Sequence, residues 1–178
     1  MPEQALSHVN VLDLTHHISG SYATKLLANL GAQVIKVERP GLGDPSRALG
    51  PFVGDDPHPE KSLPFLYLNT GKRGVTINLT NELGRSLLQP LVLWADIVVV
   101  NFSPETSLNL GVDYDSLKVI NPDAIVVSIT NFGLDGPYRN YKAWDLVEYA
   151  FGGLMYIFGT HDREPVAHAL YQAQYRAG

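Results

Sequence analysis

Residues 11–38, VLDLTHHISGSYATKLLANLGAQVIKVE, place two apolar segments on either side of a stretch compatible with a helix. We predict strands at 8–14 and 33–38 and a helix at 20–30, which Gly31 is suited to end. Two parallel strands joined by one helix cross over right-handed, and their functional end lies at the carboxyl ends of the strands. The pattern therefore predicts a βαβ unit of the kind found in nucleotide-binding sheets.

The turn after the first strand lacks the glycines of a dinucleotide site. Those glycines let the backbone approach a pyrophosphate at a helix N-terminus. Here the turn reads Thr-His-His-Ile-Ser-Gly, with two bulky imidazoles and one glycine. Glu38 stands 18 residues after Gly20, close to the place of a ribose-binding acid, but a carboxylate at a strand end is a weak signal alone. We therefore interpret the unit as a scaffold for a ligand other than NAD.

The helix predicted at 20–30 has an apolar side. Tyr22, Leu26, Leu27 and Leu30 fall on one helical face. Such a stripe is typical of an amphipathic helix.

The rest of the chain continues the alternation of strands and helices. We predict strands at 74–79, 96–100 and 124–129, and helices at 81–94, 114–120 and 143–158. The segment 39–61, rich in Gly, Pro and Asp, is long enough to be functional or disordered. This order predicts an α/β fold in one domain over residues 1–178: a Rossmann-like, mostly parallel sheet with helices on both faces.

Composition excludes several classes of function. A formal charge of −5 argues against nucleic acid or an anionic membrane as the main partner. The absence of cysteine excludes disulfides, thiolate metal sites and a thiol nucleophile. No apolar run approaches the ~20 residues that span a bilayer, and no secretory signal is visible at the start. We expect a cytoplasmic protein with no metal, no nucleic acid and no membrane partner.

Candidate site residues gather at the ends of the predicted strands. Ligands of open α/β sheets bind beyond the carboxyl edge of the strands. Each residue alone has an ordinary explanation as a strand cap, a solvated turn or a core aromatic, whereas their joint placement favours a site. Four cations are suited to bind phosphate: Arg39, Lys72, Arg73 and Lys142. Phe102 is suited to stack on an adenine ring. The residues are His16, His17, Ile18, Arg39, Lys72, Arg73, Asn101, Phe102 and Lys142.

Several short motifs together resemble one family. VLDLTHHISGSYATKLLANLGAQVIKVERPGLGD, GKRGVTINL, ADIVVVNFSP, LGVDYDSL, NPDAIVVSITNFGLDGPY and GGLM occur in this order. They are similar to segments of family III CoA-transferases, the CaiB/BaiF group that includes formyl-CoA transferase, carnitine CoA-transferase and α-methylacyl-CoA racemase. Members are much longer, and the chain ends in ALYQAQYRAG without a closing element. We therefore expect it to be the N-terminal part of the family's large domain.

The resemblance implies a CoA-binding domain within a dimer of two interlocked, ring-shaped chains. By matching position, it implies residues beside the CoA, others at its phosphates and adenine, and an acidic residue near the active site. Those beside the CoA are His16, His17 and Ile18; Arg39 and Lys142 would meet phosphates, Ile77 the adenine, and Asn101 and Phe102 would line the channel. The acidic residue is Asp145.

One position departs from the family pattern. Family transferases use an aspartate nucleophile nine residues after a proline, and counting from Pro165 that position is Gln174. The aspartate attacks the acyl-CoA thioester to form a mixed anhydride, which a carboxamide cannot do. Three explanations stay open: a non-catalytic subunit, an alignment slip, or a deliberate mutation. We favour the first. The racemase branch is disfavoured because Trp144 also replaces its histidine.

The sequence thus predicts a CoA-transferase component, which would take part in moving CoA between an acyl-CoA and a small carboxylic acid. A homologous, aspartate-bearing subunit would be its partner in a heteromeric enzyme. The alternatives are a fully active CoA-transferase whose nucleophile lies elsewhere, an NAD(P)-dependent Rossmann oxidoreductase, and a CoA-binding regulatory or scaffold protein without enzymatic activity.

Overall fold

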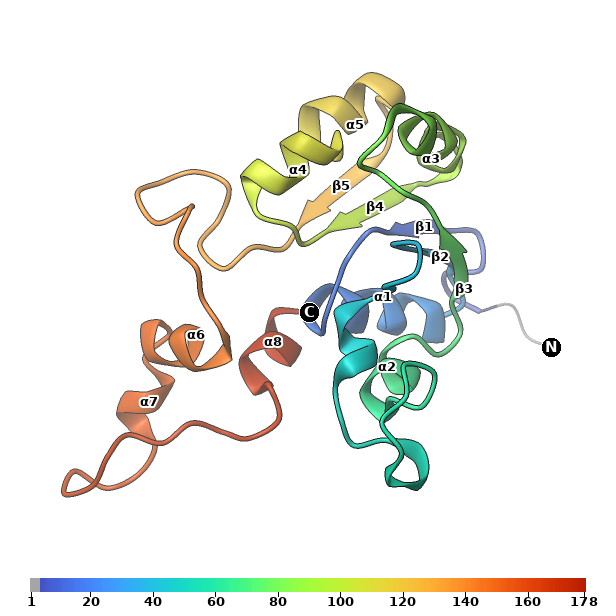
Figure 1. Ribbon diagram of the computed structural model, residues 1–178. Helices are drawn as coiled ribbons and strands as arrows, with labels where there is room; N and C mark the ends of the chain where they lie inside the picture. The colour runs from blue at the N-terminus through green and yellow to red at the C-terminus, as the bar shows by residue number, and fades with distance from the viewer. Residues whose placement is uncertain (1–3) are drawn as a thin grey trace.

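A computed structural model describes residues 4–178 and contains a five-stranded parallel sheet (Figure 1). Its order is β3-β2-β1-β4-β5, so the direction of winding reverses between β1 and β4. That reversal makes the carboxyl ends of β1 and β4 a topological switch point, where ligands of open α/β sheets bind. The strands are β1 (Asn10–Asp13), β2 (Gln33–Glu38), β3 (Arg73–Thr76), β4 (Ile97–Val100) and β5 (Ile125–Ser128).

Helices cover both faces of the sheet, as predicted for this α/β class. In Figure 1, α3, α4 and α5 lie on one side of the strands and α1 and α2 on the other. The C-terminal helix α8 packs against α1. The α-helices are α1 (Ser19–Asn29), α2 (Leu63–Leu68), α3 (Glu82–Trp94), α4 (Pro104–Leu110), α5 (Tyr114–Ile120), α6 (Asp145–Phe151), α7 (Leu154–Ile157) and α8 (Gln172–Ala177); η1 (Pro45–Ala48) and η2 (Val53–Asp55) are 3₁₀ turns.

The strands divide the interior into two hydrophobic cores, because alternate side chains point to opposite faces. Leu12 and Val98 pack with Leu88 of α3 on one face. Val11 and Val99 pack with Leu27 of α1 on the other. Each fully buried aliphatic side chain of this kind stabilises the fold by about 2 kcal/mol. The sheet is therefore a rigid platform for the loops at its carboxyl edge.

The apolar side of α1 is not its buried side. Leu26 and Leu30 are 40% and 53% exposed, although Leu27 does reach the core. The fully buried positions are small or polar and include Ser21 and Thr24. They face the sheet because they bond to charged groups beneath the first strand end, as described below.

Other differences are local. Strand β3 covers residues 73–76 instead of 74–79, so residues 77–79 lie beyond its end. The helix predicted at 143–158 is two helices, because Gly153 adopts a left-handed conformation (φ 75°) between α6 and α7. Helices α2 and α4 were not predicted, whereas α5 matches its predicted range of 114–120.

Candidate functional site

The turn after β1 lies at the switch point and is held by the residue that follows β4. Asn101 Oδ1 accepts a hydrogen bond from the His16 backbone N–H at 2.8 Å, and Asn101 Nδ2 donates to the His16 carbonyl at 2.6 Å. His17 sits in the left-handed region (φ 61°), and its N–H donates to Asp44 Oδ1 at 3.1 Å. A Cβ on Gly20 would lie 2.3 Å from Thr15 Cγ2, so only glycine allows helix α1 to start this close to the turn.

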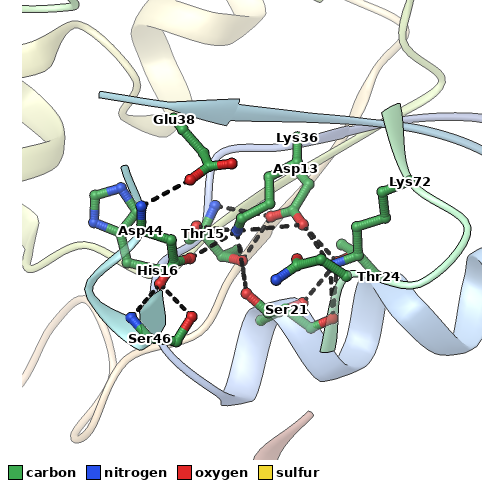
Figure 2. A network of polar contacts seen from close by, with 12 residues as sticks. Asp13, Thr15, His16, Ser21, Thr24, Lys36, Glu38, Asp44, Ser46 and Lys72 are labelled. Atoms are coloured by element: carbon green, nitrogen blue, oxygen red, sulfur yellow. Dashed lines mark hydrogen bonds and ion pairs between the residues drawn. The ribbon is translucent and has the colours of Figure 1, made fainter. Parts of the chain in front are cut away.

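A buried charge network lies directly beneath this turn (Figure 2). Asp13 ends β1 and pairs in register with Lys36 of β2. Lys36 Nζ lies 2.9 Å from Asp44 Oδ2 and donates to the Thr15 carbonyl at 2.8 Å. Asp13 Oδ2 accepts from Lys72 Nζ at 2.9 Å. Two cations and two carboxylates thus balance one another inside the protein and tie the turn to β2 and to the segments that follow β2 and precede β3.

Two hydroxyl groups and the Thr15 backbone N–H also donate to Asp13. Thr24 Oγ1 donates to Asp13 Oδ2 at 2.7 Å, and Thr15 Oγ1 donates to Oδ1 at 2.6 Å. Buried charges of this kind are tolerated only when paired and hydrogen-bonded. The bonds from α1 explain why its polar face, and not its leucine face, is turned toward the sheet.

The network sets the ionisation states around the turn. Burial alone would raise the pKa of Asp13, but Lys36 and Lys72 lower it to about 2. Burial would lower the pKa of Lys36, but Asp13 and Asp44 raise it. Burial lowers the pKa of Lys72 to about 8 and that of His16 to about 4. His16 is therefore a neutral imidazole at pH 7, able to donate one hydrogen bond and accept another.

A cavity of about 530 Å³ opens beside this turn, at the carboxyl ends of β1, β2 and β4. We call it the nucleotide cavity because of its position at the switch point. His16 and Phe102 lie in edge-to-face contact, with ring centroids 4.9 Å apart. The lining is mostly apolar, with one exposed cation at its rim, Arg39, and includes Leu14, Val37, Pro40, Leu42, Ile77, Leu79 and Leu110. The long segment after β2 contributes Pro40 and Leu42, so part of it forms the wall of a cavity.

A second cavity, of about 310 Å³, surrounds Gln174; we call it the Gln174 cavity. Ser19 of α1, Asn101 after β4 and Glu148 of α6 also line it. Burial, and then the nearby Asp145, raise the pKa of the Glu148 carboxyl group. The Glu148 side chain has no hydrogen-bond or ion-pair partner among residues 4–178. Asp145 itself binds backbone: its Oδ1 accepts from the N–H groups of Ala173 at 3.0 Å and Gln174 at 3.2 Å.

The predicted site residues separate into groups. His16, Arg39, Ile77 and Phe102 come together at the nucleotide cavity, whereas Asn101 and Gln174 share the second cavity. His17 packs edge-on against Trp144, with ring centroids 5.7 Å apart. Lys142 is exposed in the loop between β5 and α6, outside both linings. Ile18 is buried and lines neither of these two cavities.

Two of the predicted cations, Lys72 and Arg73, lie outside the linings of both cavities. Lys72 is buried, and its ammonium donates to Asp13 Oδ2, the Ser21 carbonyl and Asn69 Oδ1. These three bonds use all its donors, so it has none for a phosphate. Arg73 begins β3, at the edge of the sheet opposite the cavities, and its Nη2 donates to Gln33 Oε1. In this structure both residues are placed to support the fold.

Glu38, considered above as a ribose-binding acid, is already engaged. Arg47 donates to both of its carboxylate oxygens, at 2.7 and 2.9 Å, and the Asp44 N–H donates to Oε2 at 2.8 Å. Arg47 also stacks over Phe65, 3.7 Å from the ring centroid. Glu38 therefore anchors the segment that follows β2.

The charge network beneath the turn was missed as a functional feature. Asp13 and Lys36 are charged residues within otherwise apolar strands, VLDL and VIKV. Because the two strands were predicted to be parallel neighbours, this opposite-charge pair was a readable signal for a buried ion pair. Glu148 was also missed, and it carried no comparable signal in the sequence.

Two searches of the described residues gave negative results. Residues 4–178 contain no group of three or more His, Asp or Glu side chains arranged to hold a metal ion. No helix in that part of the chain combines the length and apolar character needed to cross a membrane.

A parallel sheet with ligand-sized cavities at its switch point defines a Rossmann-like α/β protein with a non-dinucleotide turn. Within that class, the chain belongs to CoA-transferase family III: the family's model matches residues 6–178. This confirms the family membership that the sequence motifs predicted.

Curated relatives support the assignment along most of the chain. An acetyl-CoA:oxalate CoA-transferase from Acetobacter aceti is 38% identical over 92% of this chain and 41% of its own length. A formyl-CoA:oxalate CoA-transferase from Streptomyces avermitilis is 42% identical over 92% of this chain and 39% of its own length. A subunit of succinyl-CoA:(R)-benzylsuccinate CoA-transferase from Thauera aromatica is 38% identical over 92% of this chain and 39% of its own length. The chain therefore spans about two fifths of these relatives.

Solved structures show the same fold. A CaiB/BaiF family protein from Brucella suis superposes with a TM-score of 0.89 at 38% identity, over 97% of this chain and 45% of that one. A protein from Mycobacterium tuberculosis superposes with a TM-score of 0.84 at 33% identity, over 98% of this chain and 47% of that one. The predicted α/β sheet is thereby confirmed.

Proposed function

We propose that this chain is the CoA-binding part of a CoA-transferase component, acting in the transfer of CoA from an acyl-CoA to a carboxylic acid. The observation that carries the proposal is the convergence of His16, Arg39, Ile77 and Phe102 on the nucleotide cavity. The relatives are named as CoA-transferases that act with oxalate, glutarate or benzylsuccinate, which favours a small carboxylic acid as the other substrate.

The chemistry of the nucleotide cavity suits the nucleotide end of CoA. Ile77 and Phe102 offer apolar and aromatic surface to an adenine ring. Arg39 at the rim offers a planar, charged donor to phosphate oxygens. The neutral His16 imidazole adds a hydrogen-bonding group without adding charge. Lys142, on the exposed loop, would reach a phosphate only from outside this cavity.

We infer that the chain does not supply the nucleophile. In the reaction that the family resemblance implies, a carboxylate oxygen attacks the thioester carbonyl and expels CoA thiolate, leaving a mixed anhydride. The thiolate then attacks the enzyme's own acyl carbon, which releases the free acid and leaves CoA on the enzyme. The carboxylate of the second acid then attacks the enzyme-bound thioester, and the same steps run in reverse to give the new acyl-CoA and the free enzyme carboxylate. Gln174 has no ionised oxygen, so a homologous subunit, paired with this one as an interlocked dimer, would provide the aspartate.

A second candidate is a chain that is active without a partner. Glu148 favours it, because this carboxyl group lines the same cavity as Gln174 and lacks a partner among the described residues. An NAD(P)-dependent oxidoreductase is less well supported, since Glu38 is already bound by Arg47 and the turn has no glycine loop.

The ligand can be tested by calorimetry on the full-length protein. CoA should bind and NADH should not. Replacing Arg39 by Ala should weaken CoA binding about tenfold, since a charge-assisted bond to phosphate is lost. Arg73→Ala is the matched control, because it removes the same side chain at the opposite edge of the sheet. Equal loss in both variants, or tighter binding of NADH than of CoA, would reject the proposal.

The nucleophile can be identified by trapping. Acyl-CoA and hydroxylamine convert an acyl-enzyme carboxylate into a hydroxamate, which mass spectrometry assigns to a residue. We expect the hydroxamate on an aspartate of the partner subunit. A hydroxamate on Glu148 would favour the second candidate, and turnover by this polypeptide alone would reject the non-catalytic assignment.

A further inference from the structure

A third cavity, of about 420 Å³, has four tyrosines in its lining, and we call it the tyrosine cavity. The tyrosines are Tyr22 of α1, Tyr67 of α2, and Tyr171 and Tyr175 at α8, and the buried Ile18 also lines the cavity. Pro51, Pro64 and Leu170 complete the apolar wall. Four tyrosines from three separate helices thus converge on one space, although they are up to 153 residues apart in sequence.

The tyrosine cavity adjoins the other two. His16 lines the nucleotide cavity, Ile18 the tyrosine cavity and Ser19 the Gln174 cavity. The turn between β1 and α1 therefore borders all three spaces within four residues. On α8, Gln174 faces its own cavity, while its neighbour Tyr175 faces the tyrosine cavity. The three cavities are thus arranged around one turn.

The aromatic rings are arranged to receive another ring. Tyr22 and Tyr175 meet edge to face, with centroids 5.0 Å apart and planes at 82°. Aromatic side chains prefer this geometry with one another and offer the same contacts to an aromatic ligand. Burial, and then Tyr67 and Tyr22, raise the pKa of Tyr175, so its hydroxyl stays neutral.

A positive charge beside the cavity argues against a cationic occupant. Cages of tyrosines also bind quaternary ammonium groups. Here Lys25 Nζ already lies over the Tyr67 ring, 4.5 Å from its centroid. A second cation at that ring would be repelled by the ammonium, whereas a neutral aromatic ring would not.

Backbone strain at the rim independently indicates a site. Leu170 and Tyr171 both adopt the left-handed conformation, with φ of 66° and 58°. Two consecutive side-chain-bearing residues in this region are uncommon, and such strain concentrates where a structure positions ligand-binding groups. The strained pair turns Tyr171 toward the cavity at the start of α8.

We propose that the tyrosine cavity receives the aromatic ring of an arylalkyl carboxylic acid, either as the acyl group or as the acceptor in CoA transfer. This proposal rests on the proposed function and adds a substrate class to it. The ring would pack among Tyr22, Tyr67 and Tyr175, while the carboxyl or thioester end would lie toward the turn.

Binding of three acids to the full-length protein, with its partner subunit where one exists, tests the class of ligand. Phenylpropanoate and cyclohexylpropanoate share length and charge but differ in aromaticity, and trimethylammoniobutanoate carries a cation in place of the ring. By calorimetry we expect phenylpropanoate to bind about fivefold more tightly than cyclohexylpropanoate, and trimethylammoniobutanoate to bind most weakly. Equal affinity for the first two acids, or tightest binding of the third, would overturn the proposal.

Two variants then locate the ring. Tyr67→Leu and Tyr175→Leu, on different helices, should each reduce the preference for phenylpropanoate to less than twofold. Tyr156→Leu is the control, because Tyr156 is 93% exposed and lies outside the tyrosine cavity. A preference that survives both cavity variants would refute this location.

CoA titrations on the same samples separate the two proposals. CoA binding without a preference for the aromatic acid would reject the tyrosine cavity alone. An aromatic preference without CoA binding would reject the transferase function and keep the aromatic site.

Discussion

Asp145 holds the backbone of Gln174. Its Oδ1 accepts hydrogen bonds from the N–H groups of Ala173 and Gln174, at 3.0 and 3.2 Å, so one carboxylate oxygen of α6 binds the first turn of α8. Asp145 was expected near the active site as an acidic group. Its position also gives it a structural part: it satisfies N–H groups that a helix start leaves without partners.

Removing this carboxylate should loosen α8. In Asp145→Ala, two N–H groups lose their acceptor, which typically costs about 1 kcal/mol for a helix cap. Amide hydrogen exchange at Ala173 and Gln174 should then accelerate about fivefold, while Asp145→Asn, which keeps an oxygen acceptor, should exchange nearly as slowly as the parent. Asp162→Ala serves as the control on an exposed carboxylate. Unchanged exchange in Asp145→Ala would mean that α8 is held by its packing on α1 alone.

Asn101 should act on ligand binding through the position of His16. In Asn101→Asp the bond from Nδ2 to the His16 carbonyl is lost, and the new carboxylate faces that carbonyl oxygen. We expect the free energy of unfolding to fall by about 1–2 kcal/mol and CoA to bind several-fold more weakly. Asn109→Asp, an exposed position in α4, controls for the added charge. Weaker binding in both variants would point to general repulsion of the phosphates.

The charge network predicts an order of stability losses. Lys36→Met leaves Asp44 and Asp13 buried with an unmatched charge, which should cost about 3–5 kcal/mol. Lys72→Met should cost less, about 1–2 kcal/mol, because Asp13 keeps Lys36 and two hydroxyl donors. Arg73→Met, on the exposed edge, should stay within about 0.5 kcal/mol. Urea unfolding measures all three.

The same variants separate a structural Lys72 from a phosphate-binding one. If Lys72 mainly pairs with Asp13, then Lys72→Met lowers the free energy of unfolding and leaves CoA affinity within about twofold. A tenfold loss of CoA affinity with unchanged stability would restore the role expected from the sequence.

Much of the fold could be predicted because its signals are local. The apolar runs VLDL, VIKV and IVVV mark strands buried on both faces, and the helices between them require parallel pairing. Helices α2 and α4 were missed, although each carries a local signal, a serine N-cap followed by proline in the first turn: Ser62 with Pro64, and Ser103 with Pro104.

The buried face of α1 could not be found from its own residues. Hydrophobicity favours burial of the face with Leu26 and Leu30. Ser21 and Thr24 are buried instead, because each bonds to a charged group on a strand. Those groups are Lys36 of β2, which donates to Ser21, and Asp13 of β1, which accepts from Thr24. The pairing of Lys72 could not be predicted for the same reason, since its partner Asp13 is 59 residues away. The gathering of His16, Arg39 and Phe102 was predictable, because all three follow parallel strands whose carboxyl ends share one edge.

His16 should stay neutral well below pH 6.5 in the folded protein. Burial lowers its pKa from 6.5 to about 4, so the folded state binds this proton more weakly than the unfolded state does. The contribution of His16 to stability is therefore complete above pH 6.5 and is lost as the pH falls toward 4. The pKa of Asp13 is lowered from 3.8 to about 2, so its contribution is lost at lower pH, between 3.8 and about 2. NMR of the His16 ring should show a midpoint near 4, returning to its ordinary value in concentrated urea. In His16→Gln the fall in unfolding free energy between pH 6.5 and 4 should be smaller. A His16 midpoint near 6.5 in the folded protein would contradict the partly buried, neutral imidazole.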